Sequence, residues 1–178
     1  MEVLVLGDTH IPNRAEWFPK KVDEFLKSRR FDMVACTGDL TDKSVLDYIE
    51  NLGKRVFVVS GNMDHLHLPE RQTFKLEDLR FGLIHGHQVY PRGDIRQLSE
   101  IALDMGVDVL IHGHTHSADV HFKDVLLLNP GSATGVWSGG RASLIPSFMI
   151  LKVEGNTLEV NLLELKEDLK VERRVFEL

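Results

Sequence analysis

Short apolar runs alternate with stretches of helical periodicity in the first third of the chain. Three runs rich in Val and Leu, at residues 3–6, 33–37 and 56–60, are bounded by turn residues, as expected of strands buried on both faces. In the two intervals between them, apolar residues recur three and four positions apart, which predicts helices and a βαβαβ unit with parallel strands. The helical positions are Phe18, Val22, Phe25 and Leu26 in the first interval and Val45, Leu46, Ile49 and Leu52 in the second.

The remainder of the chain follows a different pattern. Residues 80–85 and 107–112 predict strands on either side of a helix whose apolar face runs from Ile95 to Met105. Mostly β-structure follows. A Gly-Asn dipeptide separates two alternating runs, 150–154 and 157–162, which signals a hairpin, and a last strand is expected at 170–176. The segment 131–143, rich in Gly, Ser and Ala, is expected to form a mobile surface loop.

Length and composition narrow the class of protein. The 178 residues, of which 43% are hydrophobic, suffice for one core, so we expect a single domain over residues 1–178. A net charge of -6 argues against an extended nucleic-acid surface, which requires clustered Lys and Arg. The lone cysteine, Cys36, lies in an apolar run and fits a reducing compartment. The sequence shows neither a basic leader nor an apolar stretch of membrane-spanning length, so we expect a cytoplasmic protein without a membrane partner.

Polar side chains collect directly after five of the predicted strands. Ligand sites in α/β sheets form outside the carboxyl ends of the strands, where successive loops converge. We therefore expect these five segments to build one site, although they are far apart in the sequence. They are Gly7-Asp8-Thr9-His10, Gly38-Asp39-Leu40-Thr41-Asp42, Gly61-Asn62-Met63-Asp64-His65, His85-Gly86-His87 and His112-Gly113-His114-Thr115-His116.

The chemistry of the five segments favours a catalytic metal centre. Carboxylate, imidazole and amide oxygen ligands without a thiolate suit Mn, Fe, Co, Ni or Zn better than a structural zinc. The i, i+2 spacing of His114 and His116, on a segment taken as extended, points both imidazoles the same way and lets them bind adjacent ions. Asp8 and His10 share that spacing. A lone Gly-Asp is usually a turn and a lone His-x-His is often a surface feature, but five such motifs, each after a strand, favour the metal site.

The order of these motifs resembles the calcineurin-like metallophosphoesterase superfamily, whose pattern runs GD-x-H, GD, GN-x-D, a His at a strand end and GH-x-H. The resemblance covers essentially the whole chain and is closest to the small phosphodiesterases of bacteria and archaea. It implies an α/β fold in which two mixed β-sheets pack as a sandwich flanked by helices, in four layers α/β/β/α. Residues 82–89 and 129–135 also resemble the vacuolar protein sorting 29 subunits of the eukaryotic retromer coat, which are scaffolds.

The resemblance implies two divalent metal ions, with Mn²⁺ expected first and Ni²⁺, Co²⁺, Zn²⁺ or Fe²⁺ as alternatives. The reaction that it implies is hydrolysis of a small phosphodiester by in-line attack of a metal-bridging hydroxide on phosphorus. Asp39, as the bridging ligand, and Asn62, as a neutral oxygen ligand, are assigned catalytic roles. The implied ligands are Asp8, His10, Asp39 and His116 for one ion, and Asp39, Asn62, His85 and His114 for the other.

The chain departs from the wider superfamily at Met63, where many members have a histidine that can protonate the leaving group. His65 is a candidate for that role, with an ordinary loop histidine as the equal alternative. Without a strong general acid, substrates whose leaving oxygen is a weak base, such as aryl esters, should react fastest. His87, two residues beyond a predicted ligand, is a candidate phosphate contact, with loop packing as the alternative.

Residues near the predicted ligands are given supporting roles. Asp64 is expected to anchor its own loop in preference to orienting a ligand histidine, and His112 is expected to be structural. Residues 129–132 are candidates to bring backbone donors near the site. Trp137 and Arg141 are candidates to stack on a substrate or pair with it.

A phosphomonoesterase of the same fold and a metal-binding scaffold are the alternative functions. The retromer resemblance implies Asn at the bridging position and no Gly-Asn pair in that subunit. This chain instead has Asp39 and Gly61-Asn62, which favours catalysis. The expected partner is therefore a small-molecule phosphodiester, and analogy with related phosphodiesterases suggests a homo-oligomer.

Overall fold

Three parallel strands form one half of the first sheet, as the apolar runs predict. The computed structural model describes all residues, 1–178, and places β1 (Glu2–Leu6) beside β2 (Phe31–Cys36), which pairs with β3 (Gly53–Val58). Two helices, α1 (Lys20–Lys27) and α2 (Lys43–Glu50), connect these strands. The α2 helix begins where the Asp42 side chain accepts a hydrogen bond from the backbone N–H of Ser44. The βαβαβ unit is therefore confirmed.

The last three strands of the chain complete the same sheet. β9 (Ser147–Glu154) pairs antiparallel with β1, β10 (Thr157–Leu165) pairs with β9, and β11 (Leu169–Glu177) pairs with β10. The strand order is β11-β10-β9-β1-β2-β3. The hairpin around Gly155-Asn156 and the final strand are confirmed, each longer than the alternating pattern alone predicts.

A second sheet contains five strands in the order β4-β5-β6-β8-β7. The strands are β4 (Arg71–Leu76), β5 (Leu79–Ile84), β6 (Val109–Ile111), β7 (Asp119–Phe122) and β8 (Leu126–Asn129). α3 (Ile95–Met105) connects the parallel strands β5 and β6 and ends at Gly106, whose φ of 64° suits a residue without a Cβ. β6 is only half as long as the predicted strand 107–112, and β4 is an addition to the sequence prediction.

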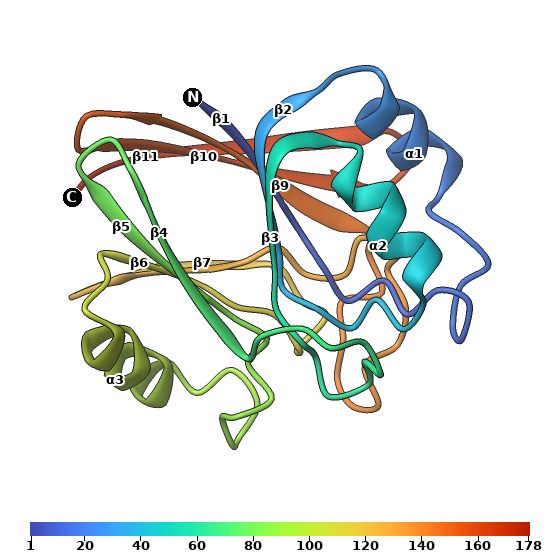
Figure 1. Ribbon diagram of the computed structural model, residues 1–178, viewed down its shortest axis with the longest axis horizontal. Coiled ribbons are helices and arrows are strands. Elements are labelled where there is room, and N and C mark those ends of the chain that lie inside the picture. Colours follow the sequence, from blue (N-terminus) through green and yellow to red (C-terminus); the bar gives the residue numbers. More distant parts are fainter.

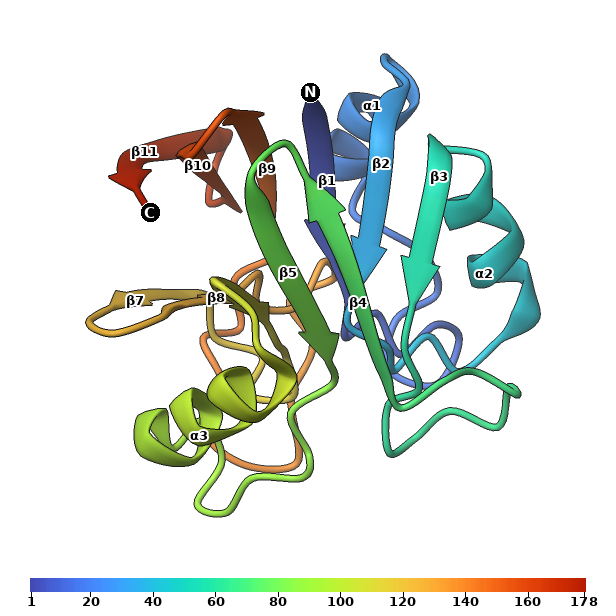
Figure 2. The same ribbon diagram turned by 60° about the vertical axis from the view of Figure 1, so that its left-hand side comes forward.

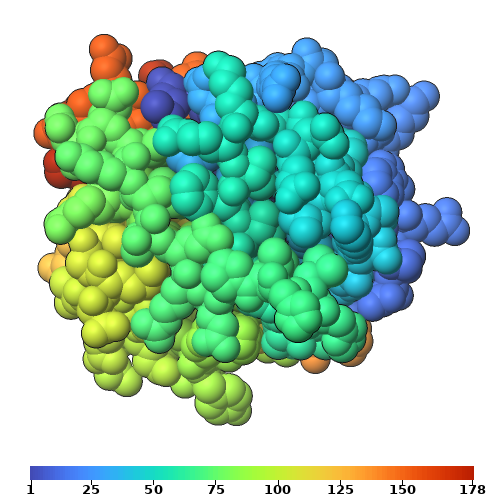
Figure 3. Space-filling view, viewed as in Figure 1, coloured from blue at the N-terminus to red at the C-terminus, as the bar shows by residue number.

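The two sheets pack face to face and helices cover their outer faces (Figure 1). A cluster of 18 buried residues joins the inner faces of both sheets, for example Val5 and Met33 with Leu83 and Ile111. A second cluster joins the first sheet to α1 and α2, and a third joins the second sheet to α3. In the space-filling view, α2 in cyan and the β4–β5 hairpin in green lie on the face turned to the viewer (Figure 3). The predicted four-layer α/β/β/α arrangement is confirmed.

The loop predicted at 131–143 is not a surface loop along its whole length. Gly131, Ser132 and Ala133 are buried, and the backbone N–H of Ala133 donates to the carbonyl of Gly7. The prediction was wrong there because small residues are also what a close approach of two loops requires. From Trp137 onwards the segment is mostly exposed.

The topology brings the ends of both sheets to one place. β2, β3 and β5 all run toward the lower end of the molecule in Figure 2, where the loops that follow them gather. None of the helices is long and apolar enough to cross a membrane.

Candidate metal centre

The loops that follow five strands carry the seven predicted metal ligands to the same end of the molecule. Four of the ligands come from the first sheet and three from the second. Asp8 and His10 follow β1, Asp39 follows β2, Asn62 follows β3, His85 follows β5, and His114 and His116 follow β6.

Six of these residues form two groups with the spacing of a metal site. In each group, one ligand atom per residue lies within 4.8 Å of the others. Every member is buried except His114, which is half-buried. The first group is Asp8, His10 and His116, and the second is Asp39, His85 and His114. Each group therefore draws on both sheets.

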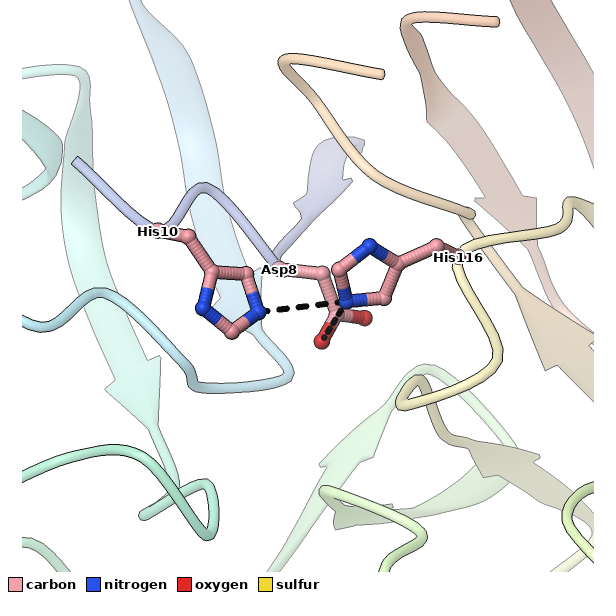
Figure 4. Close-up of side chains that lie close together, drawn as sticks. All are labelled: Asp8, His10 and His116. Carbon is pink, nitrogen blue, oxygen red and sulfur yellow. Dashed lines mark hydrogen bonds and ion pairs between the residues drawn. The ribbon is translucent and has the colours of Figure 1, made fainter. Parts of the chain in front are cut away.

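The imidazoles of the first group turn toward each other beside a carboxylate (Figure 4). His10 Nε2 lies 3.1 Å from His116 Nε2, which lies 3.4 Å from Asp8 Oδ1. His116 Nδ1 donates to the carbonyl of Val136 at 2.7 Å, so in the neutral ring the lone pair is on Nε2. That lone pair faces the other two ligand atoms.

The carboxylate of Asp39 connects the two groups. Its Oδ2 lies 3.4 Å from His85 Nε2 in its own group and 3.3 Å from His10 Nε2 in the other. His85 Nδ1 donates to the carbonyl of Thr37 at 2.7 Å, which again leaves Nε2 for the site. Asn62 is exposed, yet its Oδ1 lies 3.2 Å from the same Nε2.

The protonation states of Asp39, His10 and His114 favour cation binding, whereas His85 must first lose a proton. Burial would raise the pKa of Asp39, but its contacts with His85 and the Met63 N–H lower it to about 2, so the carboxylate is ionised. Burial lowers the pKa of both His10 and His114 to about 4, which keeps them neutral at pH 7. Burial alone would lower the pKa of His85, but Asp39 and Asp8 raise it to about 9. A proton thus occupies His85 Nε2 in the metal-free protein, and a metal ion would displace it.

A buried oxygen without a hydrogen-bond partner also supports cation binding. Asp8 Oδ2 accepts a hydrogen bond from the backbone N–H of His114 at 2.9 Å, whereas Asp8 Oδ1 is buried without a hydrogen-bond partner. A buried carboxylate oxygen without a donor is costly. A divalent cation between Asp8 Oδ1 and the imidazoles of His10 and His116 would satisfy it, so the residues fit a metal ion.

The ligands lie on tight turns, not on extended segments. Five of them have left-handed backbone angles, so the alternation of side chains along a strand, which the i, i+2 argument assumed, does not apply. That argument was wrong in its geometry, although His114 and His116 do fall in different groups and Asp8 and His10 in the same one. The φ values are 51° at Asp8, 47° at His10, 51° at Asp39, 70° at His114 and 54° at His116.

Side chains behind the ligands hold these strained turns. Asp64 accepts backbone N–H groups from Asp39 at 2.8 Å, Thr41 at 2.8 Å and Gly61 at 2.9 Å. Asp64 therefore anchors the loops after β2 and β3, as predicted. A Cβ on Gly61 would lie 2.0 Å from Asp39 Oδ1, so only glycine lets that carboxylate approach.

The segment after β8 fixes the ligand loops from the other side. Ser132 Oγ donates to the carbonyl of Asp8 at 2.7 Å, and Asn129 Nδ2 donates to Thr115 Oγ1 at 2.9 Å. Residues 129–132 were predicted to supply backbone donors; Ser132 and Asn129 instead act through their side chains on the turns that carry Asp8 and His114. The Asn-Pro-Gly-Ser sequence predicts a turn, but it does not predict which loops this turn contacts.

Three of the other predicted residues lie in different settings. The ring of His87 is exposed and lies 5.4 Å from that of His85 and 6.3 Å from that of His114, between centroids. His65 is exposed and belongs to neither group. Trp137 is 58% exposed, and the Arg14 guanidinium lies over its ring and donates to its carbonyl.

Comparison with known proteins identifies the family. The model of the calcineurin-like phosphoesterase superfamily domain matches residues 1–156. The chain belongs to this superfamily. A probable metallophosphoesterase of Methanocaldococcus jannaschii is 44% identical over 169 residues, which cover 94% of this chain and 83% of that protein.

Solved structures of similar phosphoesterase fold come from Vps29 proteins. Vacuolar protein sorting 29 from Cryptosporidium parvum is 31% identical with a TM-score of 0.95, covering 99% of this chain and 98% of that one. Wild-type Vps29 from Entamoeba histolytica, complexed with Zn²⁺, is 36% identical with a TM-score of 0.91, covering 98% and 99%. The chain is thus a calcineurin-like phosphoesterase superfamily member with two candidate divalent-metal sites.

Proposed function

We propose that this protein is a phosphodiesterase that hydrolyses small phosphodiesters with two divalent metal ions, Mn²⁺ first among them. The observation that carries the proposal is the position of Asp39 Oδ2, 3.3 Å from His10 Nε2 and 3.4 Å from His85 Nε2. One carboxylate oxygen between an imidazole of each group suits a bridging ligand. The proposed ligands are Asp8, His10, Asp39 and His116 for one ion, and Asp39, Asn62, His85 and His114 for the other.

The charged and neutral ligands have different roles in the proposed site. When bound, two divalent ions would activate water, clamp the phosphoryl oxygens and stabilise the leaving oxygen. Asp39 and Asp8 supply the negative charge, whereas the neutral oxygen of Asn62 leaves the centre cationic enough to attract a phosphate anion. This local positive charge is compatible with the net charge of -6.

The proposed preference for good leaving groups rests on the loop after β3. Met63 has no proton to donate, and its backbone N–H is already bound to Asp39 Oδ1 at 2.8 Å. We propose His65, which is exposed, as a substitute acid only for leaving groups that its loop can reach. His87 is better placed, beside the rings of His85 and His114, and is proposed to contact the substrate phosphate.

Metal-dependent turnover tests the proposal. Metal-stripped protein receives Mn²⁺, Ni²⁺, Co²⁺, Zn²⁺ or Mg²⁺ singly and is assayed on bis(4-nitrophenyl) phosphate and 4-nitrophenyl phosphate. We expect metal-dependent turnover that favours the diester and falls at least 100-fold in Asp39→Asn. The matched control is Asp119→Asn, because Asp119 is an exposed carboxylate on β7 that belongs to neither group. A preference for the monoester would instead indicate a phosphomonoesterase.

A metal-binding scaffold is the second candidate, favoured by the TM-score of 0.95 with a Vps29 structure. It predicts bound metal without turnover of either ester, which the same assay detects when metal content is measured in parallel. The intact set of ligands, with Asp39 and Asn62 in place, supports the enzyme over the scaffold.

The remaining expectations are proposals of the same kind. We propose that residues 1–178 act as one domain, supported by the 18-residue cluster shared by both sheets. A cytoplasmic location and self-association are likewise proposed, the latter to be measured by light scattering of the metal-loaded protein.

A further inference from the structure

A hollow of about 480 Å³ adjoins both candidate metal groups, because one of its lining residues is the sequence neighbour of a member of each group. Thr115, which lines it, lies between His114 of one group and His116 of the other. Ser143, also in its wall, donates through its hydroxyl to the carbonyl of His116 at 3.0 Å. The wall consists of two arginines, three hydroxyl residues and an alanine, with no carboxylate: Arg92, Thr115, Ser117, Arg141, Ala142 and Ser143.

One guanidinium in this wall is held in place with part of its hydrogen-bonding capacity unused. Arg92 Nη1 donates to Ser138 O at 2.8 Å and to Ser138 Oγ at 3.3 Å. The same guanidinium lies beside Gly139 and Gly140, since a Cβ on either glycine would come within 4 Å of it. Arg92 is exposed and its Nε and Nη2 have no protein acceptor, so the cation that Ser138 holds through Nη1 keeps free donors at the hollow.

Neither arginine of the hollow is neutralised by a carboxylate. Arg92 and Arg141 make no salt bridge, in a chain whose acidic residues outnumber its Lys and Arg by 27 to 21. The arginines that do pair with acids are Arg71, Arg80, Arg96, Arg173 and Arg174.

We propose that this hollow binds a second phosphate group of the substrate. The preferred substrates are then phosphodiesters that carry a further phosphate beyond the ester that is cleaved. Arginine presents several N–H donors in a fixed fork that matches phosphate oxygens, and Ser117, whose hydroxyl makes no hydrogen bond within the protein, adds another donor. The inference rests on the proposed function and extends it from the reacting phosphate to the rest of the substrate.

Two aryl esters that differ only by one phosphate test this proposal. The Mn²⁺-loaded protein is assayed on thymidine 5′-(4-nitrophenyl phosphate) and on the same ester carrying a 3′-phosphate. We expect the 3′-phosphate to raise kcat/KM about tenfold or more. Arg141→Gln should reduce this ratio about tenfold, and Arg92→Lys, which keeps a cation and a donor for Ser138, should reduce it less. Arg96→Gln, on the exposed face of α3, is the matched control and should keep the wild-type ratio.

Calorimetry separates failure of the hollow from failure of the proposed function. Thymidine 3′,5′-bisphosphate should bind the Mn²⁺-loaded protein about tenfold more tightly than thymidine 5′-monophosphate, and Arg141→Gln should remove the difference while its melting temperature stays at that of the wild type. If both esters resist hydrolysis but this difference in affinity is found, the phosphate site stands and the phosphodiesterase fails. If the wild type shows no preference for the added phosphate in either experiment, or Arg141→Gln retains it, the proposal is overturned.

Discussion

At the scale of single residues, the candidate centre combines several features that are unfavourable by themselves. Asp8 is fully buried with one oxygen lacking a donor, and five ligands have left-handed backbone angles that non-glycine residues rarely adopt. The surrounding hydrogen bonds of Asp64 and Ser132 maintain these turns. Strained residues gathered at one end of two sheets are typical of a binding or catalytic site.

A pH dependence of stability is expected from His112, which is 3% exposed. Burial lowers its pKa from 6.5 to about 4, so the folded protein binds its proton less readily than the unfolded chain. The resulting stability is complete above pH 6.5 and is lost as the pH falls toward 4. Between pH 7 and pH 5 this group should cost about 2 kcal/mol.

Urea denaturation of metal-free protein at pH 7 and pH 5 measures this effect, with His112→Asn as the comparison. The variant should lose about 2 kcal/mol less than the wild type over this interval, because its side chain does not titrate. Equal losses in both proteins would show that His112 is not held neutral by the fold.

At the scale of elements, the periodicity of apolar residues predicts the helices and most long strands well. α3 has the bounds that the pattern gives, since Leu98 and Ala102 face the sheet and Gly106 ends the helix. The periodicity does not predict the shorter or more exposed strands. Only every other residue of β4 is shielded from solvent, and β7 is an edge strand. Their formation depends on pairing with β5 and β8, which local sequence does not encode.

Two leucines on α3 should differ sharply in their contribution to stability. Leu98 is fully buried in the cluster that also contains Ile84, Leu110 and Leu127, whereas Leu103 is 68% exposed. Leu98→Ala should lower the free energy of unfolding by about 2–5 kcal/mol, and Leu103→Ala by less than about 0.5 kcal/mol. Chemical denaturation of both variants provides the measurement, and a similar cost for both would contradict the packing of α3 described above.

At the scale of the whole molecule, the metal groups join the two sheets. Each group takes residues from loops of the first sheet and of the second, so a bound ion would link the sheets at one end of the sandwich. A surface hollow of about 690 Å³ includes Lys152 and Arg173 of β9 and β11 and none of the metal groups. The site is therefore located by the metal-binding side chains that converge there, and not by the size of a cavity.

Metal binding should therefore raise the thermal stability of the protein as a whole. Mn²⁺ at 100 times its dissociation constant should add about 2.7 kcal/mol to the free energy of unfolding, which corresponds to a rise in melting temperature of roughly 5–10 °C for a chain of this length. Asp39→Asn should lose most of this rise and Asp119→Asn should keep it, as measured by calorimetric melting with EDTA and with Mn²⁺. An unchanged rise in Asp39→Asn would exclude Asp39 as a ligand.

The sequence by itself determined the strands of the βαβαβ unit, the final hairpin, and the clustering of polar residues after the strands. These features are local, because they depend on residue periodicity and on which residues end a strand. The order of motifs was enough to point to the family that the comparison with known proteins then identified.

Only the tertiary structure decided which strands are neighbours and which ligands share an ion. β9 lies beside β1 although more than 140 residues separate them, and Asp39 Oδ2 faces imidazoles from two different loops. The hollow at Arg92 likewise forms from three loops that are distant in the sequence. Such contacts arise from packing of the two sheets and from left-handed turns held by remote side chains, and neither leaves a periodic signal along the chain.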